Sequence, residues 1–202
     1  MNRIVLRDNR RKSIFSAAVK CFNKNGYYKT SMDMIAERAK MTKRGLYYHF
    51  KSKDELFIEL FHYMNKKYYE QVESYATEVS DPEERIQLFL EIANKIIYEN
   101  TDFLKFSREF MAIGVRKPKI RAVMKFYYKD QVEKVRKTIV KGIDSGKFVN
   151  IDSEKVARAI VLITIGAFNV YFTLKADYDL VDQHTFNISH ILKGLKKHQD
   201  TA

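Results

Sequence analysis

Apolar residues recur at helical spacing through almost the whole chain. Near the N-terminus they occupy positions 14, 17, 18, 21 and 22, and these intervals of three and four residues place them on one face of a helix. The Asn25-Gly26 pair predicts the end of that helix, because glycine readily adopts the left-handed backbone of a C-terminal cap. The same period continues to the C-terminal region, so we expect an all-α protein of about nine helices.

Residues that favour helix starts divide the remaining pattern. Examples are Thr30 followed by Asp33, Thr42, and Ser52 followed by Glu55, since a short polar side chain can accept a hydrogen bond from the first helical N–H groups. The later helices are expected to begin at Asp81-Pro82, Thr101 or Asp102, Pro118 and Asp152, and near Asp182. After the first helix we therefore expect helices at about 32–39, 42–50, 52–79, 82–100, 101–114, 118–145, 152–176 and 182–197.

The charge of the chain is unevenly distributed. Residues 1–53 contain 14 Lys/Arg and 3 Asp/Glu, whereas the other 149 residues contain 23 and 22 (37 − 14 and 25 − 3), so most of the net +12 lies in the first quarter. A basic head on a neutral body is typical of proteins that bind polyanions. We therefore divide the chain into a DNA-binding domain at 1–53 and a second domain at 54–202.

Several other classes of protein are disfavoured by the composition. The single Cys21 excludes an intramolecular disulfide framework and fits a reducing, cytoplasmic location. The five histidines show no metal-ligand spacing, and no nucleophile or phosphate-loop motif is present, so we expect no enzyme activity, metal or cofactor. Residues 159–174 carry no charge, but they fall short of the ~20 residues that span a bilayer, so we expect a buried helix and no membrane.

The basic head contains the pattern of a helix-turn-helix unit, at about 31–50. Ala36 is small enough for the crossing of two helices, and a turn at 39–41 separates it from a candidate recognition helix at 42–50. Leu46 and Phe50, four residues apart, are expected to face the core together with Ile35. The opposite face then presents Lys43, Arg44, Tyr47, Tyr48 and His49 outward.

At these residues the sequence resembles the TetR family of transcriptional regulators. The resemblance covers about fifty residues, including Asn25-Gly26-Tyr27, Thr30-Ser31-Met32, Ile35-Ala36 and the run from Leu46 to Phe57. The resemblance implies phosphate contacts, which hydroxyl, imidazole and ammonium groups suit chemically: Thr30, Ser31, Thr42, Tyr47, Tyr48, His49 and Lys53. It implies base contacts at the start of the recognition helix, where an arginine can bind guanine bidentately: Lys43, Arg44 and Gly45.

Some positions depart from the family pattern or leave alternatives open. Most members have glycine at position 40, where Lys40 stands, and glycine at 44, where this chain has Arg44-Gly45, so the target sequence cannot be transferred from relatives. Tyr27 favours packing over DNA contact. His49 is alternatively an exposed surface histidine. The N-terminal arginines form either a solvated tail or an arm that reaches DNA: Arg3, Arg7, Arg10 and Arg11.

The neutral body is expected to bind a small ligand and to form a homodimer. Its many aromatic and methionine side chains suit an apolar or aromatic effector, including one with an acyl chain. The candidate contacts are Phe89, Phe103, Phe106, Phe110, Met111, Met124, Tyr127, Phe168, Tyr171 and Phe172. The last two predicted helices carry apolar stripes that are the candidate dimer interface, with completion of a monomer core as the alternative: Val156, Ile160, Ile163, Ala167, Val170, Ile188, Ile191, Leu192 and Leu195.

The sequence therefore predicts a DNA-binding transcriptional regulator, most simply a repressor released from a pseudo-palindromic operator by a small apolar effector. Two other classes share some of these features. One is an architectural DNA-binding protein that has the same scaffold and no effector. The other is a basic membrane-surface protein that uses the apolar segment at 159–174.

Overall fold

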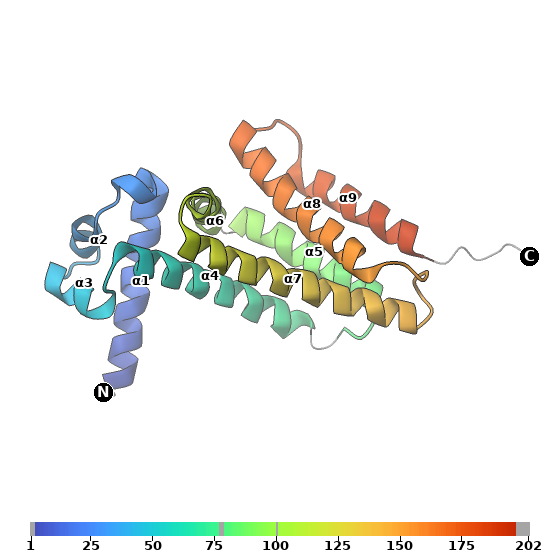
Figure 1. Ribbon diagram of the computed structural model, residues 1–202, viewed down its shortest axis with the longest axis horizontal. Helices are drawn as coiled ribbons and strands as arrows, with labels where there is room; N and C mark the ends of the chain where they lie inside the picture. The colour runs from blue at the N-terminus through green and yellow to red at the C-terminus, as the bar shows by residue number, and fades with distance from the viewer. Residues whose placement is uncertain (1–2, 77–78, 100, 197–202) are drawn as a thin grey trace, which may run out of the picture. The chain divides into compact units, whose positions relative to one another are not determined.

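The computed structural model describes residues 3–76, 79–99 and 101–196. Across these residues the chain forms nine helices joined by short connections (Figure 1). They are α1 (Arg3–Lys29), α2 (Met32–Arg38), α3 (Lys43–His49), α4 (Lys53–Ala76), α5 (Pro82–Glu99), α6 (Thr101–Gly114), α7 (Pro118–Asp144), α8 (Ser153–Leu174) and α9 (Leu180–Leu195). Within these ranges the only extended pairing is one isolated bridge between Phe148 and Lys196. The predicted all-α class is confirmed.

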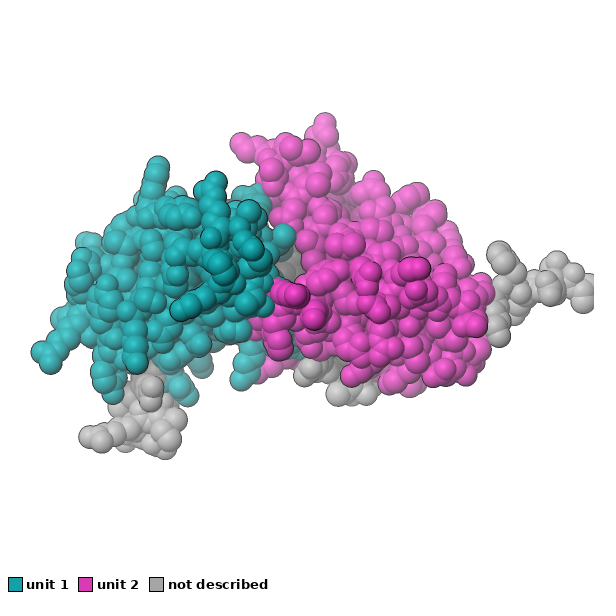
Figure 2. Space-filling view, in the orientation of Figure 1, with its two compact units in different colours: residues 1–69, 100–124 teal, residues 70–99, 125–202 magenta. Residues whose placement is uncertain are grey.

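The helices form two compact units, coloured separately in Figure 2. Unit 1 comprises Met1–Tyr69 and Asn100–Met124, and unit 2 comprises Glu70–Glu99 and Lys125–Ala202. Unit 1 thus holds the predicted DNA-binding segment and, in addition, much of α4, all of α6 and the first turns of α7. The chain enters each unit twice, which the charge pattern could not reveal.

Capping residues define most helix starts as expected, with two corrections. The side chain of Ser31, rather than that of Thr30, caps α2 by accepting from the N–H of Met34 at 3.2 Å. The start of α9 is Leu180, two residues before the predicted start, because the carboxylate of Asp179 accepts from the following N–H groups. Asp81 and Asp152 cap α5 and α8 as predicted.

Unit 1 is held together by a cluster of aromatic rings from three helices. The ring of Phe22 (α1) lies 4.8 Å from that of Phe57 (α4), which in turn lies 4.9 Å from Phe106 (α6). Phe61 and Phe110 stack at 3.8 Å between α4 and α6. Aromatic side chains bury large areas, so this cluster accounts for the inclusion of α6 in the unit that contains the head.

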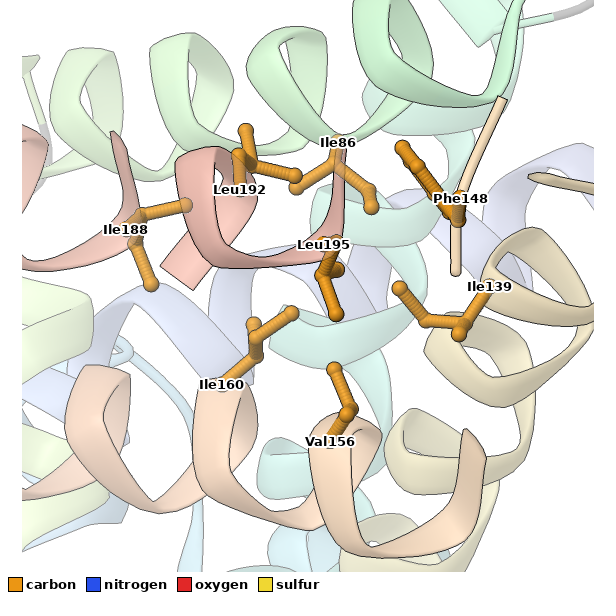
Figure 3. Packing of buried hydrophobic residues seen from close by; sticks show 8 residues of the cluster. All are labelled: Ile86, Ile139, Phe148, Val156, Ile160, Ile188, Leu192 and Leu195. Atoms are coloured by element: carbon orange, nitrogen blue, oxygen red, sulfur yellow. The ribbon is translucent and has the colours of Figure 1, made fainter. Parts of the chain in front are cut away.

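Unit 2 has its own core, contributed by α5, α7, α8 and α9. Figure 3 shows the side chains that point toward one another there: Ile86, Ile139, Phe148, Val156, Ile160, Ile188, Leu192 and Leu195. Phe148 lies over Gly142, where an added Cβ would stand only 2.0 Å from the ring. This close approach packs the segment after α7 against the helix itself.

The apolar helix α8 divides its residues between core and surface. It is long and apolar enough to cross a membrane by length and composition, a criterion that core helices of soluble proteins also meet. Val156, Ala157, Ile160 and Val161 are buried in unit 2, but within the uncharged segment 159–174 only Ile160 and Val161 are, so the prediction of a buried helix there is wrong for most of its residues. Residues on the other side of the helix are exposed, among them Leu162 at 52%.

A buried polar network joins α5, α8 and α9 within unit 2. The ring of His184, 1% exposed, contacts Asn94 Oδ1 through Nδ1 at 3.1 Å and Thr164 Oγ1 through Nε2 at 3.0 Å. The amide nitrogen of Asn94 donates to Thr185, so its oxygen accepts and the Nδ1 of His184 carries the proton. Burial lowers the pKa of His184 to about 4 and keeps the ring neutral.

We predict that unfolding experiments will detect this buried histidine. The unfolded chain binds a proton below its ordinary pKa of 6.5, whereas the folded chain does so only near 4, so stability is complete above about pH 6.5 and falls as the pH approaches 4. In the wild type the free energy of unfolding should fall by an amount on the order of 2–3 kcal/mol across this window, and in His184→Gln this fall should be absent. Urea unfolding at several pH values measures both. His190→Gln, an exposed histidine on the same helix, should leave the pH dependence intact; equal behaviour of the two variants would contradict the assignment.

Candidate nucleic-acid interface

The short helix α3 is held in place by its apolar face. Leu46 and the C-cap Phe50 are each 0% exposed, and on α2 Ile35 is 0% and Ala36 is 3% exposed. A helix of seven residues is not stable alone in water, so this packing is what fixes it. The predicted core face of the helix-turn-helix unit is confirmed.

The opposite face of α3 is open. Tyr47 is 42% and Tyr48 is 81% exposed, and Arg44 is exposed with no hydrogen-bond or ion-pair partner among the described residues. His49 is half-buried and contacts the rings of Tyr48 and Phe50, so it is not a fully exposed surface histidine. An unpaired guanidinium beside two outward phenols can donate hydrogen bonds to base edges and phosphates.

Lys43 links the two helices of the motif. Its ammonium lies 2.8 Å from the carboxylate of Asp33 on α2, and both side chains are exposed. The hydrogen bond and the charge of Asp33 raise the pKa of Lys43. Lys43 therefore helps to hold the angle between α2 and α3 in addition to its predicted place at the DNA surface.

The turn between α2 and α3 accommodates both departures from the family pattern. Lys40 has a φ of 53°, so it adopts the left-handed backbone that glycine would adopt at lower cost. Thr42 caps α3 by accepting from the N–H of Gly45 at 3.1 Å. A Cβ on Gly45 would lie 3.2 Å from that hydroxyl oxygen, so glycine at this position leaves room for the cap.

Two predicted phosphate contacts are directed into the protein instead. Thr30 is 1% exposed, and its hydroxyl lies 2.7 Å from the carbonyl of Gly26 and 3.1 Å from that of Cys21. Lys53 donates to the carbonyls of Tyr27, Tyr28 and Thr30 at 2.7, 3.3 and 2.8 Å. The carbonyls of Tyr27 and Tyr28 lie in the last turn of α1 and that of Thr30 directly after it, so the ammonium of Lys53 caps that helix end and its three protons are used.

Tyr27 occupies the centre of this helix end, and the prediction that it packs is confirmed. Its side chain is 2% exposed, with the ammonium groups of Lys53 and Lys117 at 4.4 and 5.1 Å from the ring. Its hydroxyl donates to Asp54, and its N–H donates to the carboxylate of Glu109 on α6 at 2.6 Å. Burial raises the pKa of Glu109, and burial together with the charge of Lys117 lowers that of Lys53.

The N-terminal arginines have different surroundings. Arg11 donates to Glu59 on α4 at 3.1 Å and lies 4.8 Å above the ring of Phe50, so it joins α1 to α4 and to the end of α3. This role has no signal in the local sequence, because Glu59 is 48 residues away along the chain. Arg10 is exposed on α1, and the side chains of Arg3 and Arg7 lie outside the described residues.

The predicted effector contacts divide between the two units. In unit 1, Phe106 and Phe110 are 0% exposed in the aromatic cluster, so these two assignments are wrong: their rings leave no surface for an effector. The other candidates are half-buried, in unit 1 Phe103, Met111 and Met124, and in unit 2 Phe89, Tyr127, Phe168, Tyr171 and Phe172.

The predicted dimer stripe is mainly the inner face of unit 2. Five of its residues are buried within the single chain, so their assignment to an interface is wrong and the alternative of a monomer core holds: Val156, Ile160, Ile188, Leu192 and Leu195. Ile163 and Ile191 are partly buried against the same core, and Ala167 is half-buried. Only Val170, 49% exposed, lies on the open face.

The fold and the exposed recognition helix define a helix-turn-helix DNA-binding protein, and comparisons show which family it resembles. The sequence profile of the bacterial regulatory proteins of the tetR family matches residues 14–60. The chain is 28% identical over 197 residues to the uncharacterized HTH-type transcriptional regulator YhgD of Bacillus subtilis, covering 93% of this chain and 97% of that protein. Residues 14–60 therefore match the DNA-binding region of the tetR family, and the chain as a whole is similar to transcriptional regulators of that type.

Other relatives match over less than half of this chain. The Staphylococcus aureus regulator QacR is 32% identical over 42% of this chain and 45% of its own length. The Pseudomonas putida transcriptional repressor NicS is 31% identical over 40% of this chain and 38% of its own length. The chain thus spans under half the length of these two relatives in the matched region.

Solved structures share the fold over nearly the whole chain. A TetR regulator from Haloarcula marismortui superposes with a TM-score of 0.85 at 20% identity, covering 94% of this chain and all of that one. A Saccharomonospora viridis protein in complex with choline gives 0.84 at 18% identity, covering 95% and 100%. The regulator FadR from Bacillus subtilis in complex with stearoyl-CoA gives 0.76 at 20% identity, covering 91% and 98%.

We predict that Lys53 stabilises the protein without contributing a phosphate contact through its ammonium. Lys53→Met should lower the free energy of unfolding by about 1–3 kcal/mol, because carbonyls at a helix end lose their donor. The slope of log binding constant against log salt for a duplex should stay unchanged. Lys51→Met, an exposed lysine two residues earlier, should change stability by less than about 0.5 kcal/mol. A slope that fell at unchanged stability would instead assign Lys53 to the DNA surface.

Proposed function

We propose that the protein is a homodimeric repressor that binds a pseudo-palindromic operator and leaves it when a small, largely apolar effector binds the second unit. The observation that carries the DNA-binding part is the division of α3 into a fully buried face and an exposed face with an unpaired Arg44. Packing alone gives no reason to expose two phenols and a guanidinium side by side. A duplex gives that reason, since its major groove admits one helix.

Arg44 is the proposed base-reading residue. It stands in the first turn of α3, where helix-turn-helix proteins contact base edges, and its five donors suit the O6 and N7 atoms of guanine. Tyr47, Tyr48 and the N-cap residues Ser31 and Thr42 lie on the accessible side, where they suit phosphate oxygens. Gly45 allows close backbone approach, and His49 at the helix end suits a phosphate.

Dimer formation is proposed through the open face of α8 and α9. Leu162 (52%), Val170 (49%) and Phe186 (55%) are exposed, large apolar side chains on these helices. A Cβ added to Gly166 or Gly194 would meet nothing within 4 Å, so both glycines leave room for another helix. A second copy of the chain suits this surface, because two recognition helices at a fixed spacing read two half-sites.

An effector site is proposed among the half-buried aromatic side chains of unit 2: Phe89, Tyr127, Phe168, Tyr171 and Phe172. The related folds hold ligands of two kinds, choline in one protein and stearoyl-CoA in another, and aromatic rings suit both a quaternary ammonium group and an acyl chain. The dimer then dissociates from the operator if the effector favours a spacing of its two DNA-binding domains that no longer fits the operator. The name of NicS supports repression as the outcome of binding.

The variant Arg44→Ala tests the proposed base contact of α3. Selection of binding sites from a random duplex pool, followed by titration, should show that the variant loses about 1–3 kcal/mol of preference at one base pair of each half-site. Lys12→Ala, an exposed cation on α1 of the same unit, should leave the preference at every position unchanged. A wild-type protein without salt-sensitive affinity for any duplex would refute the proposed function itself.

The dimer surface is tested by Leu162→Glu. A buried carboxylate at an apolar interface is costly, so the variant should sediment as a monomer at concentrations at which the wild type is a dimer. Phe126→Glu places the same charge at another exposed apolar residue, 64% exposed on α7, and should remain dimeric. A monomeric wild type, or dissociation by both variants alike, would contradict this assignment.

A further inference from the structure

The turn between α6 and α7 is the most basic part of unit 1 outside the head. Residues 110–124 contain four cations, Arg116, Lys117, Lys119 and Arg121, and no acidic residue. All four belong to the same compact unit as the helix-turn-helix motif. The net charge of residues 54–202 is close to zero, so it gives no indication of this local excess of positive charge.

Two of these cations build the turn. Arg121 donates to the carbonyls of Gly114 and Val115 at the end of α6, which closes the turn onto the first part of α7. Lys117 contacts both carboxylate oxygens of Asp54, at 3.0 and 2.8 Å. Asp54 lies in the first turn of α4, directly after the helix-turn-helix motif, so Lys117 fixes the turn to the head.

Further contacts hold α6 against the end of α1. The carboxylate of Glu109 accepts the N–H of Tyr27, and Asn23 donates to the carbonyl and the side chain of Asp102 at 3.0 and 3.1 Å. Together with the aromatic cluster, these bonds tie α6 to α1 in the first turn of α6 and again at Glu109. The α6–α7 turn is thereby a rigid part of the unit that carries the recognition helix.

The other two cations are free. Arg116 and Lys119 are exposed, and no ion pair or hydrogen bond engages either side chain among the described residues. The ammonium groups of their neighbour Lys117 and of Lys53 lie 5.1 and 4.4 Å from the centre of the Tyr27 ring. Lys53 in turn donates to the carbonyl of Thr30, one residue before the N-cap of α2. The turn therefore lies beside the edge of the motif at which phosphate contact is proposed.

We propose that Arg116 and Lys119 form a second, sequence-independent contact with DNA, to phosphates flanking the base pairs that α3 reads. This inference rests on the proposed function. Two unpaired cations fixed beside a DNA-binding edge add attraction for the duplex backbone, because each phosphate they neutralise releases condensed counterions. They read no bases, so they extend the footprint and affinity of unit 1 without changing its sequence preference.

The test compares salt dependence on a mixed-sequence duplex of about 40 base pairs, long enough for several helical turns. Arg116→Ala/Lys119→Ala should reduce the slope of log binding constant against log salt by about 0.9 for each phosphate that is no longer neutralised, and should weaken binding to all sequences alike. The exchange Arg116→Lys/Lys119→Arg keeps both charges and should restore the wild-type slope. Lys129→Ala/Lys141→Ala removes two exposed cations from the part of α7 that belongs to unit 2, and it should change the slope less than Arg116→Ala/Lys119→Ala does.

Each other outcome has a definite meaning. A wild type that binds the duplex, together with a double alanine variant of identical slope and affinity, overturns this inference and leaves the proposed function standing. A wild type without duplex affinity refutes both. Loss of binding to phosphatidylserine vesicles in the double variant, with duplex binding unchanged, overturns the inference in favour of a membrane surface. Circular dichroism melting of each variant verifies that the fold is retained.

Discussion

The burial of Leu46 and Phe50 in the core of unit 1 is the constraint on which the DNA-binding surface depends. A seven-residue helix has too few internal hydrogen bonds to persist alone, so α3 exists because packing within unit 1 removes its apolar face from water. Because the apolar face of α3 packs in the core, the opposite face of the helix is exposed to solvent. The orientation of Arg44, Tyr47 and Tyr48 is thus a consequence of apolar packing rather than of any interaction that they make themselves.

The end of α1 joins this head to α6. Tyr27 meets charged groups from three directions: Lys53 and Asp54 at the start of α4, Glu109 on α6, and Lys117 after it. A displacement of α6 therefore acts directly on the helix ends beside the motif. The same arrangement makes α6 part of the unit that carries DNA contacts, although the chain reaches it only after passing through the other unit.

In unit 2, helical spacing identifies the apolar faces of α8 and α9 but does not identify the helices that pack against them. The spacing of the stripes on α8 and α9 is compatible with a dimer interface, yet Val156, Ile160 and Ile188 pack against Ile86 of α5 and Ile139 of α7 in the same chain. A helix buried on one side and open on the other has two apolar surfaces. The period of 3.6 residues marks both, and only the packing shows which one is used within the monomer.

The sequence by itself determined the helical class, the helix-turn-helix motif, its core residues and the outward direction of α3, because these follow from spacing along one helix and from caps within a few residues. Only the tertiary structure decided that Thr30 and Lys53 face carbonyls at the end of α1, that Arg11 pairs with Glu59, and that the α6–α7 turn belongs to the same compact unit as the head. The physical reason is distance along the chain: a side chain's partner tens of residues away leaves no mark in local periodicity, and the partner determines whether a cation binds a protein carbonyl or remains free for DNA.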